Sequence, residues 1–78
     1  MHLEIVTPDT TVFEGEVSLV QLPGLDGSFE VLDHHMPMIA GLAKGKVKVI
    51  DIHKKESFFE IKGGVLEVLD NKVMVLAQ

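Results

Sequence analysis

Two adjacent histidines, His34 and His35, are candidate ligands for a metal ion. Metal ligation requires side chains that converge on one point, and neighbours in an extended chain point to opposite sides. His2 and His53 lie far away in the sequence, and no cysteine is present to supply a thiolate ligand. We therefore expect two turn histidines, one packed and one in water, and no metal site.

The segment from Gly41 to Lys46 contains some of the residues of a phosphate-binding loop. The Walker pattern places four residues between its glycines and a serine or threonine after its lysine. Here three residues separate Gly41 from Gly45, and Val47 follows the lysine. The segment is expected to form a turn before a strand, without a bound nucleotide or other cofactor.

General acid–base catalysis would need a pair of carboxyl groups, for example Asp26 with Glu30. One of the two must lie in an apolar pocket that raises its pKa, but the residues between them, which include Ser28, suggest exposure. The other serines, Ser18 and Ser57, do not lie in a nucleophile elbow either. No catalytic residue is predicted, and we do not expect the protein to be an enzyme.

Lys72 follows Asp70 and Asn71, a pair that tolerates the positive φ of a tight hairpin turn. Lipoyl and biotinyl carrier domains are small β sandwiches that present a modified lysine at such a turn. In those domains the lysine lies near the middle of the chain, and the biotinyl domains carry a Met-Lys-Met signature that is missing here. A carrier domain modified at Lys72 is the alternative function.

A cluster of apolar residues surrounds the glycine turn and the segment after it: Leu25, Phe29, Met36, Met38 and Ile39. Methionine suits contact surfaces because its side chain is flexible and polarizable, and exposed apolar clusters usually mark a partner. For Phe29 and Ile39 a place in the core is equally open. Leu25 is expected to be exposed, so this region is interpreted as a protein-binding surface.

Alternation of polar and apolar residues with period two dominates the chain and predicts strands that position these residues. Alternation places Val17, Leu19 and Gln21 on one face of their strand, and no helix is expected. Turn signals at short intervals predict an all-β fold, an antiparallel β sandwich or flattened barrel, as a single domain over residues 1–78. The expected strands are 2–7, 11–16, 17–23, 27–32, 38–43, 46–52, 56–62, 64–69 and 72–77.

Composition excludes several classes of partner. The chain has 78 residues and a formal net charge of -5, which argues against binding to nucleic acid or to anionic lipid through a basic face. Its apolar runs are far shorter than the roughly 20 residues that span a bilayer, and its amino terminus does not read as a signal peptide. We expect a soluble cytoplasmic protein without direct membrane insertion.

Four stretches of the chain, in order and without large gaps, resemble the amino-terminal domain of the epsilon subunit of F-type ATP synthases (delta in mitochondria). Each motif alone is weak, whereas the ordered set is specific and covers essentially the whole chain. The stretches are His2–Asp9 with Val12–Gly15, Val20–Leu32 with His35 and Pro37, Leu42 with Gly45, and Phe59–Ala77.

The resemblance implies a β sandwich of about ten short strands and a non-catalytic subunit of the rotating central stalk of a proton-translocating F-type ATP synthase. Such a subunit binds the gamma subunit and the membrane c-ring and helps couple proton-driven rotation to ATP synthesis. It would lie on the cytoplasmic side of the bacterial inner (plasma) membrane, attached peripherally through the complex.

Carried over by position, the two contacts fall on two separate segments. The c-ring contact is expected at the turn formed by Leu25, Asp26, Gly27, Ser28 and Phe29. The gamma contact is expected at Thr7, His35, Met36, Pro37 and Met38.

The sequence departs from most members of the family at its carboxy terminus. Those members continue into a pair of helices that binds ATP in some bacteria and can inhibit ATP hydrolysis. This chain stops at Gln78, where the predicted sandwich ends. We therefore expect no ATP site and no inhibitory helices.

Overall fold

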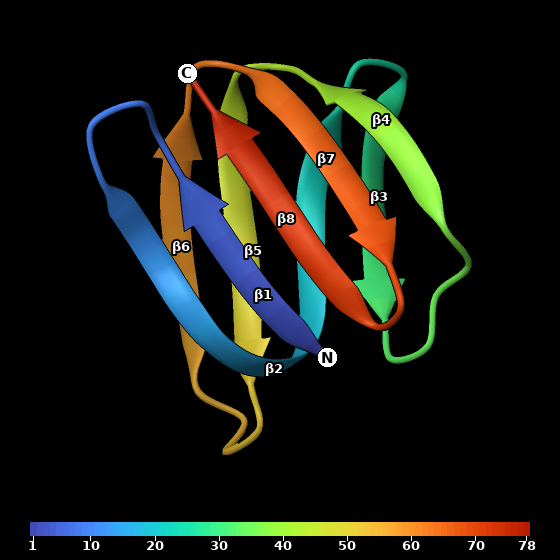
Figure 1. Cartoon of the computed structure of the whole chain (residues 1–78). Coiled ribbons are helices and arrows are strands. Elements are labelled where there is room, and N and C mark those ends of the chain that lie inside the picture. Colours follow the sequence, from blue (N-terminus) through green and yellow to red (C-terminus); the bar gives the residue numbers. More distant parts are fainter.

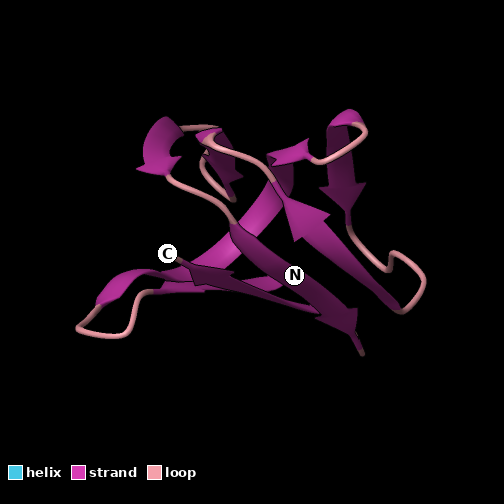
Figure 2. Cartoon of the chain, turned by 90° about the horizontal axis from the view of Figure 1, so that it is seen from above, coloured by secondary structure: helices cyan, strands magenta, loops and turns pink.

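Every regular element of the protein is a β-strand, and the computed structural model describes all of residues 1–78 (Figure 1). The all-β sandwich predicted from the alternation is thereby confirmed, and the view from above shows only strands and loops (Figure 2). The eight strands are β1 (His2–Val6), β2 (Thr11–Gly24), β3 (Gly27–Leu32), β4 (Met38–Leu42), β5 (Gly45–Asp51), β6 (Glu56–Ile61), β7 (Gly64–Leu69) and β8 (Lys72–Ala77).

The strands form two layers that share β2. The first layer contains β4, β7, β8, β1 and the first half of β2, and the second contains β3, the second half of β2, β5 and β6. Strands β1, β8, β7 and β4 lie in front in Figure 1. One pairing departs from the antiparallel prediction, because β1 runs parallel to β8 whereas all other neighbours are antiparallel.

The chain has eight strands instead of about ten, partly because the expected strands 11–16 and 17–23 are one continuous strand of 14 residues. A β-bulge between Val17 and Leu19 increases the bend of β2, so that one strand serves both layers. The bulge also corrects the predicted face. Val17 is buried, but beyond the bulge the buried residues are Val20 and Leu22, not Leu19 and Gln21.

The core between the layers is a single cluster of 16 buried hydrophobic residues, and no polar or charged residue is buried. It is aliphatic, with Leu3, Leu22 and Leu66 among its fully buried side chains. Phenylalanines pack only at its margin, where the rings of Phe13 and Phe59 lie 5.5 Å apart. The inward residues of β5, β7 and β8 alternate regularly along each strand, because these strands contain no bulge.

Candidate protein-binding surfaces

The turn between β2 and β3, hereafter the tip (Leu25–Phe29), projects from one end of the sandwich (Figure 1). Gly24 and Gly27 are paired across a turn of two residues, and Gly27 has a φ of 124° that favours glycine. The expectation that Leu25 is exposed is confirmed, since 70% of its surface is accessible. Phe29 is turned inward and packs against the core, so four of the five tip residues face solvent.

The tip is held against the edge of the first layer by β4. The Leu25 N–H donates to the Gly41 carbonyl (N···O 3.2 Å), and the Ala43 N–H donates to the Pro23 carbonyl (2.7 Å). A hollow of about 460 Å³ lies between the tip and β4, lined by Gly24–Phe29 on one side and Ile39–Gly41 on the other. Sequence reasoning did not connect Gly41 with the tip, although a glycine inside a strand indicates a close approach of another segment.

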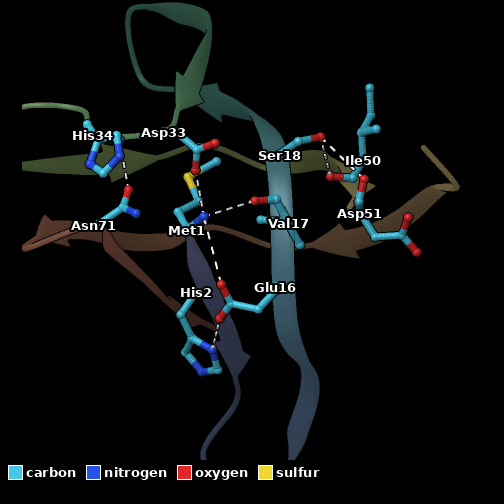
Figure 3. A network of polar contacts seen from close by, with 10 residues as sticks. All are labelled: Met1, His2, Glu16, Val17, Ser18, Asp33, His34, Ile50, Asp51 and Asn71. Carbon is cyan, nitrogen blue, oxygen red and sulfur yellow. Dashed lines mark hydrogen bonds and ion pairs between the residues drawn. The ribbon is translucent and has the colours of Figure 1, made fainter. Parts of the chain in front are cut away.

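The His35–Met38 segment comprises the end of the connection between β3 and β4 and the first residue of β4, Met38. Met36 is 76% exposed, whereas Met38 is half-buried and packs against the core. Nδ1 of His35 lies 2.7 Å from the Met36 carbonyl, a local contact that shapes the turn. His34 adopts a left-handed φ of 62°, and its N–H donates to Oδ1 of Asn71 at 2.7 Å (Figure 3).

Thr7 lies in the connection between β1 and β2, where its hydroxyl accepts a hydrogen bond from the Thr10 N–H at 3.2 Å. The preceding Val6 pairs with Leu76, near the carboxyl end of β8. The His34 segment instead contacts Asn71, directly before the amino end of β8. The predicted gamma residues therefore do not form one cluster, but lie at opposite ends of the first layer.

The outer side of the first layer, hereafter the front face, carries exposed apolar residues between these two ends, together with Glu4, Glu67 and Lys72. Gly41, Val65, Leu76 and Val6 are directly opposite one another on β4, β7, β8 and β1, and so form an apolar row across four strands. Beside this row Ile39 is 73% exposed. A shallow hollow of about 400 Å³ on this side is lined by Pro37–Ile39 and Glu67–Leu69.

Only Ile39 among the exposed front-face residues was singled out from the sequence. The sequence left open whether it lies in the core or on the surface, and the structure places it on the surface. The signal for the others was present in β7 and β8. Val65 and Leu76 are apolar at positions that alternation assigns to the outer side, although Glu67 and Lys72 occupy other outer positions of the same strands. Outward apolar residues of this kind indicate that part of a strand is covered on both sides.

The remaining candidates lie apart from one another. Asp26 is at the tip, Glu30 is exposed on β3, and Lys72 is exposed at the start of β8. Gly41 lies within β4 and Gly45 is the first residue of β5, so only the residues between these two strands form the turn. No group of three or more histidine, cysteine, aspartate or glutamate residues is placed to hold a metal ion, and no helix has the length and hydropathy of a membrane span.

Three ionisable side chains have shifted pKa values, all in surface contacts. The hydrogen bond that the His2 ring donates to the Glu16 carboxylate (2.9 Å) raises the pKa of His2, with a further contribution from Glu14 (3.2 Å). The amino group of Met1, 2.6 Å away, lowers the pKa of Asp33 (Figure 3). The pKa of Asp51 is lowered by backbone hydrogen bonds, first from Lys55. These contacts connect strands and turns, and none lies in an enclosed pocket.

Comparison with known sequences identifies the relatives of this chain. Residues 1–78 match the family described as the β-sandwich domain of the ATP synthase delta/epsilon chain. The ATP synthase epsilon chain of Chlorobium limicola is 45% identical over 76 residues, which cover 97% of this chain and 86% of that relative. The epsilon chain of Salinibacter ruber is 44% identical over 86 residues, covering 100% of this chain but 58% of its own length.

Solved structures with a similar fold come from mitochondrial ATP synthases. A chain in the OSCP/F1/c-ring structure from Euglena gracilis superimposes with a TM-score of 0.89 at 25% identity, covering 96% of this chain and 48% of that one. A chain in the central stalk/c-ring structure from Tetrahymena thermophila gives a TM-score of 0.80 at 18% identity, which shows a shared fold. This chain spans 62% of that second protein.

Proposed function

Because the chain belongs to the delta/epsilon-chain family of ATP synthases, we propose that it is a non-catalytic subunit of the central stalk of a proton-translocating F-type enzyme. In this role it binds the gamma subunit and the c-ring and helps couple rotation to ATP synthesis. It would be attached peripherally at the cytoplasmic side of the bacterial inner membrane. The observation that carries the proposal is the apolar front face, which continues to the exposed tip at one end.

The front face is the surface that we assign to the gamma subunit. The centre of a stable protein interface is depleted in charge and apolar, and its rim is polar. The row from Gly41 to Val6 has this character, Thr7 directly follows Val6 at one end of the row, and Met36 lies at the opposite end of the first layer.

The tip is the surface that we assign to the c-ring. It offers one large apolar side chain, Leu25, together with the small or acidic residues Asp26, Gly27 and Ser28. A narrow projection of this kind can reach a second partner while the broad face stays with the first. Its turn of two residues keeps it short, and its backbone hydrogen bonds to β4 hold it in place.

The mechanism is adhesion between neighbours that turn together. Transmission of torque needs contacts that resist deformation, and a close-packed interior has low compressibility. The sandwich supplies such an interior, since its core is one continuous cluster without a buried polar or charged side chain. The protein would act as a stiff wedge, and the chemistry of ATP synthesis would take place at distant sites on other subunits.

Co-purification from host membranes tests the proposal. The chain, with an affinity tag in an exposed loop such as Ile52–Lys55, is extracted in mild detergent and its partners are identified by mass spectrometry. We expect the gamma and c subunits to accompany it, and an unmodified intact mass of the chain itself. Recovery of the folded chain without either subunit would contradict the proposal. A lipoyl or biotinyl mass increment on Lys72 would favour the carrier alternative.

A further inference from the structure

We propose that Gly41 is a positioning residue, whose missing side chain forms a seat for Leu25 and thereby fixes the tip to β4. The inference rests on the proposed function, because the tip is the assigned c-ring contact and β4 carries part of the assigned gamma contact. The seat would join the two contact surfaces of the subunit through a single pair of residues.

The space above Gly41 is filled by the side chain of the tip. A Cβ atom at Gly41 would lie 2.5 Å from Cδ1 of Leu25 and 3.3 Å from its Cγ, so no other residue fits while Leu25 stays in place. The Leu25 N–H, which donates to the Gly41 carbonyl at 3.2 Å, fixes the backbone of the same pair. Both the side chain and the main chain of Leu25 therefore dock on one glycine.

The backbone of β4 does not itself require glycine at this position. Gly41 pairs with Val65 as a regular antiparallel partner, and its φ lies outside the left-handed region. A strand glycine without a backbone reason often marks the close approach of another segment. Here that segment is the tip.

The seat has a consequence for binding because Leu25 is otherwise 70% exposed. An exposed leucine at a free loop end samples several rotamers and loses this freedom when a partner binds. A leucine that already lies on β4 has lost part of this freedom before the partner arrives, which favours affinity. The seat also lies two residues from Ile39 on the outer side of β4, so a load on the tip passes directly to the front face.

A double-mutant cycle tests the seat, with Gly41→Ala, Leu25→Ala and the double variant assayed for binding to detergent-solubilised host c-rings. The clash at Gly41 involves the end of a flexible side chain, so Gly41→Ala should fold while Leu25 is displaced. We expect at least a tenfold loss of ring affinity from Gly41→Ala in the wild-type background and less than a twofold change in the Leu25→Ala background. Coupling of this kind is specific to residues in contact.

Gly15→Ala is the matched control, because a Cβ at that strand glycine would meet only the Phe13 ring, at an ordinary 3.5 Å. It should leave ring affinity unchanged, and the melting temperatures should confirm that all variants fold. Ring affinity of Gly41→Ala equal to wild type, or an equal loss in both backgrounds, would overturn the seat as a positioning device.

Nuclear magnetic resonance separates failure of the seat from failure of the proposed ring contact. In the free wild-type chain we expect contacts between the Leu25 methyl groups and the Gly41 α-protons, which disappear in Gly41→Ala. Their absence from the wild type would overturn the seat itself. If they are present but the wild-type chain does not bind c-rings, the proposed ring contact fails, and the role given to the seat fails with it.

Discussion

The outer sides of the two layers differ although the same strand, β2, contributes to both. The front face of the first layer carries an apolar row over four strands and the exposed Ile39. The outer side of the second layer, hereafter the rear face, mixes exposed apolar residues such as Phe58 with Lys46, Lys48 and Glu60. On the rear face Lys48 pairs with Glu56 at 3.5 Å, a contact that water tolerates well.

This difference indicates which layer is built for a partner. Isolated exposed apolar residues among charges are normal on a soluble surface, whereas a contiguous apolar patch marks an interaction site. Residues 1–43 contain no lysine or arginine, and Lys72 is the only one in β1, β4, β7 and β8, whereas Lys46 and Lys48 both lie on the rear face. We therefore expect the front face to respond to substitutions through binding and the rear face to tolerate them.

The largest expected effect separates the inner from the outer side of the front layer. On β7 the side chain of Leu66 is fully buried, whereas the neighbouring Val65 is 42% exposed. Leu66→Ala should lower the free energy of unfolding by about 2–5 kcal/mol, because it removes buried methyl groups and leaves a cavity. Val65→Ala should lower it by less than about 1 kcal/mol. Urea unfolding measures both, and equal losses would contradict the assignment of the two sides of β7.

The next effect compares the two faces in binding. Ile39→Glu places a charge at the β4 edge of the front face, directly opposite Glu67 of β7, and should weaken gamma binding by about 10- to 100-fold, since an unpaired charge is desolvated in the interface. Phe58→Glu is the matched rear-face variant, and its affinity should stay within about twofold of wild type. Both residues are exposed, at 73% and 57%, so neither change should unfold the chain. Isothermal calorimetry with purified gamma subunit gives both values.

Ile39 is a better probe of this face than Met38, which the resemblance to the family had suggested. Met38 packs against the core, so a glutamate there would weaken binding and stability together. An unchanged gamma affinity for Ile39→Glu, or an equal loss for Phe58→Glu, would refute the assignment of the front face.

A smaller effect concerns the bulge that gives β2 a place in both layers. The Ser18 hydroxyl donates towards the carbonyls of Ile50 (3.2 Å) and Asp51 (3.3 Å), opposite the irregular part of β2 (Figure 3). Ser18→Ala should lower the free energy of unfolding by about 0.5–1.5 kcal/mol, the net contribution of one such hydrogen bond. Ser57→Ala, at a serine of β6 without a side-chain hydrogen bond, serves as the control in urea unfolding, and a loss as large as that of Ser18→Ala would argue against the role of the hydroxyl.

The smallest effect is a pH dependence of opposite sign in the two layers. The pKa of His2, in the first layer, is raised above 6.5, so its contribution to stability is complete below that pH and is lost as pH rises through the folded-state pKa. The pKa of Asp51, in the second layer, is lowered below 3.8. Its contribution is complete above that pH and is lost as pH falls through the folded-state pKa.

Urea unfolding from acid to mildly alkaline pH measures both contributions. His2→Asn should reduce the decline of stability near and above neutral pH, and Asp51→Asn should reduce the decline in acid. If either variant changes the opposite end of the profile, the assignment of that slope is wrong.

The sequence predicted the parts of the fold that depend on local chemistry. The hairpin of β7 and β8 was correct because alternation and an Asp-Asn turn are both local, and Asp70 and Asn71 have the expected φ values of 52° and 60°. The continuity of β2 and the parallel pairing of β1 with β8 were not predicted. Both depend on pairing between segments far apart in the chain, on which the alternation of a single strand carries no information.

The candidate surfaces were also predicted only in part. Exposure of Leu25 followed from its place in a glycine turn and is confirmed, while Phe29 at the same turn is half-buried. The apolar row through Val65 and Leu76 was missed because its members come from four strands and only register brings them together. The assignment of either surface to a partner stays a prediction.

A methyl-resolved nuclear magnetic resonance titration with the gamma subunit tests the central claim most directly, because isoleucines occur on both outer faces. Ile39 lies on the front face, Ile50 lies on the rear face, and Ile52 lies in the exposed turn between β5 and β6. If the front face is the docking surface, the Ile39 methyl signals shift or broaden on binding while those of Ile50 and Ile52 keep their positions. Changes at Ile50 and Ile52 with Ile39 unaffected would contradict the proposal.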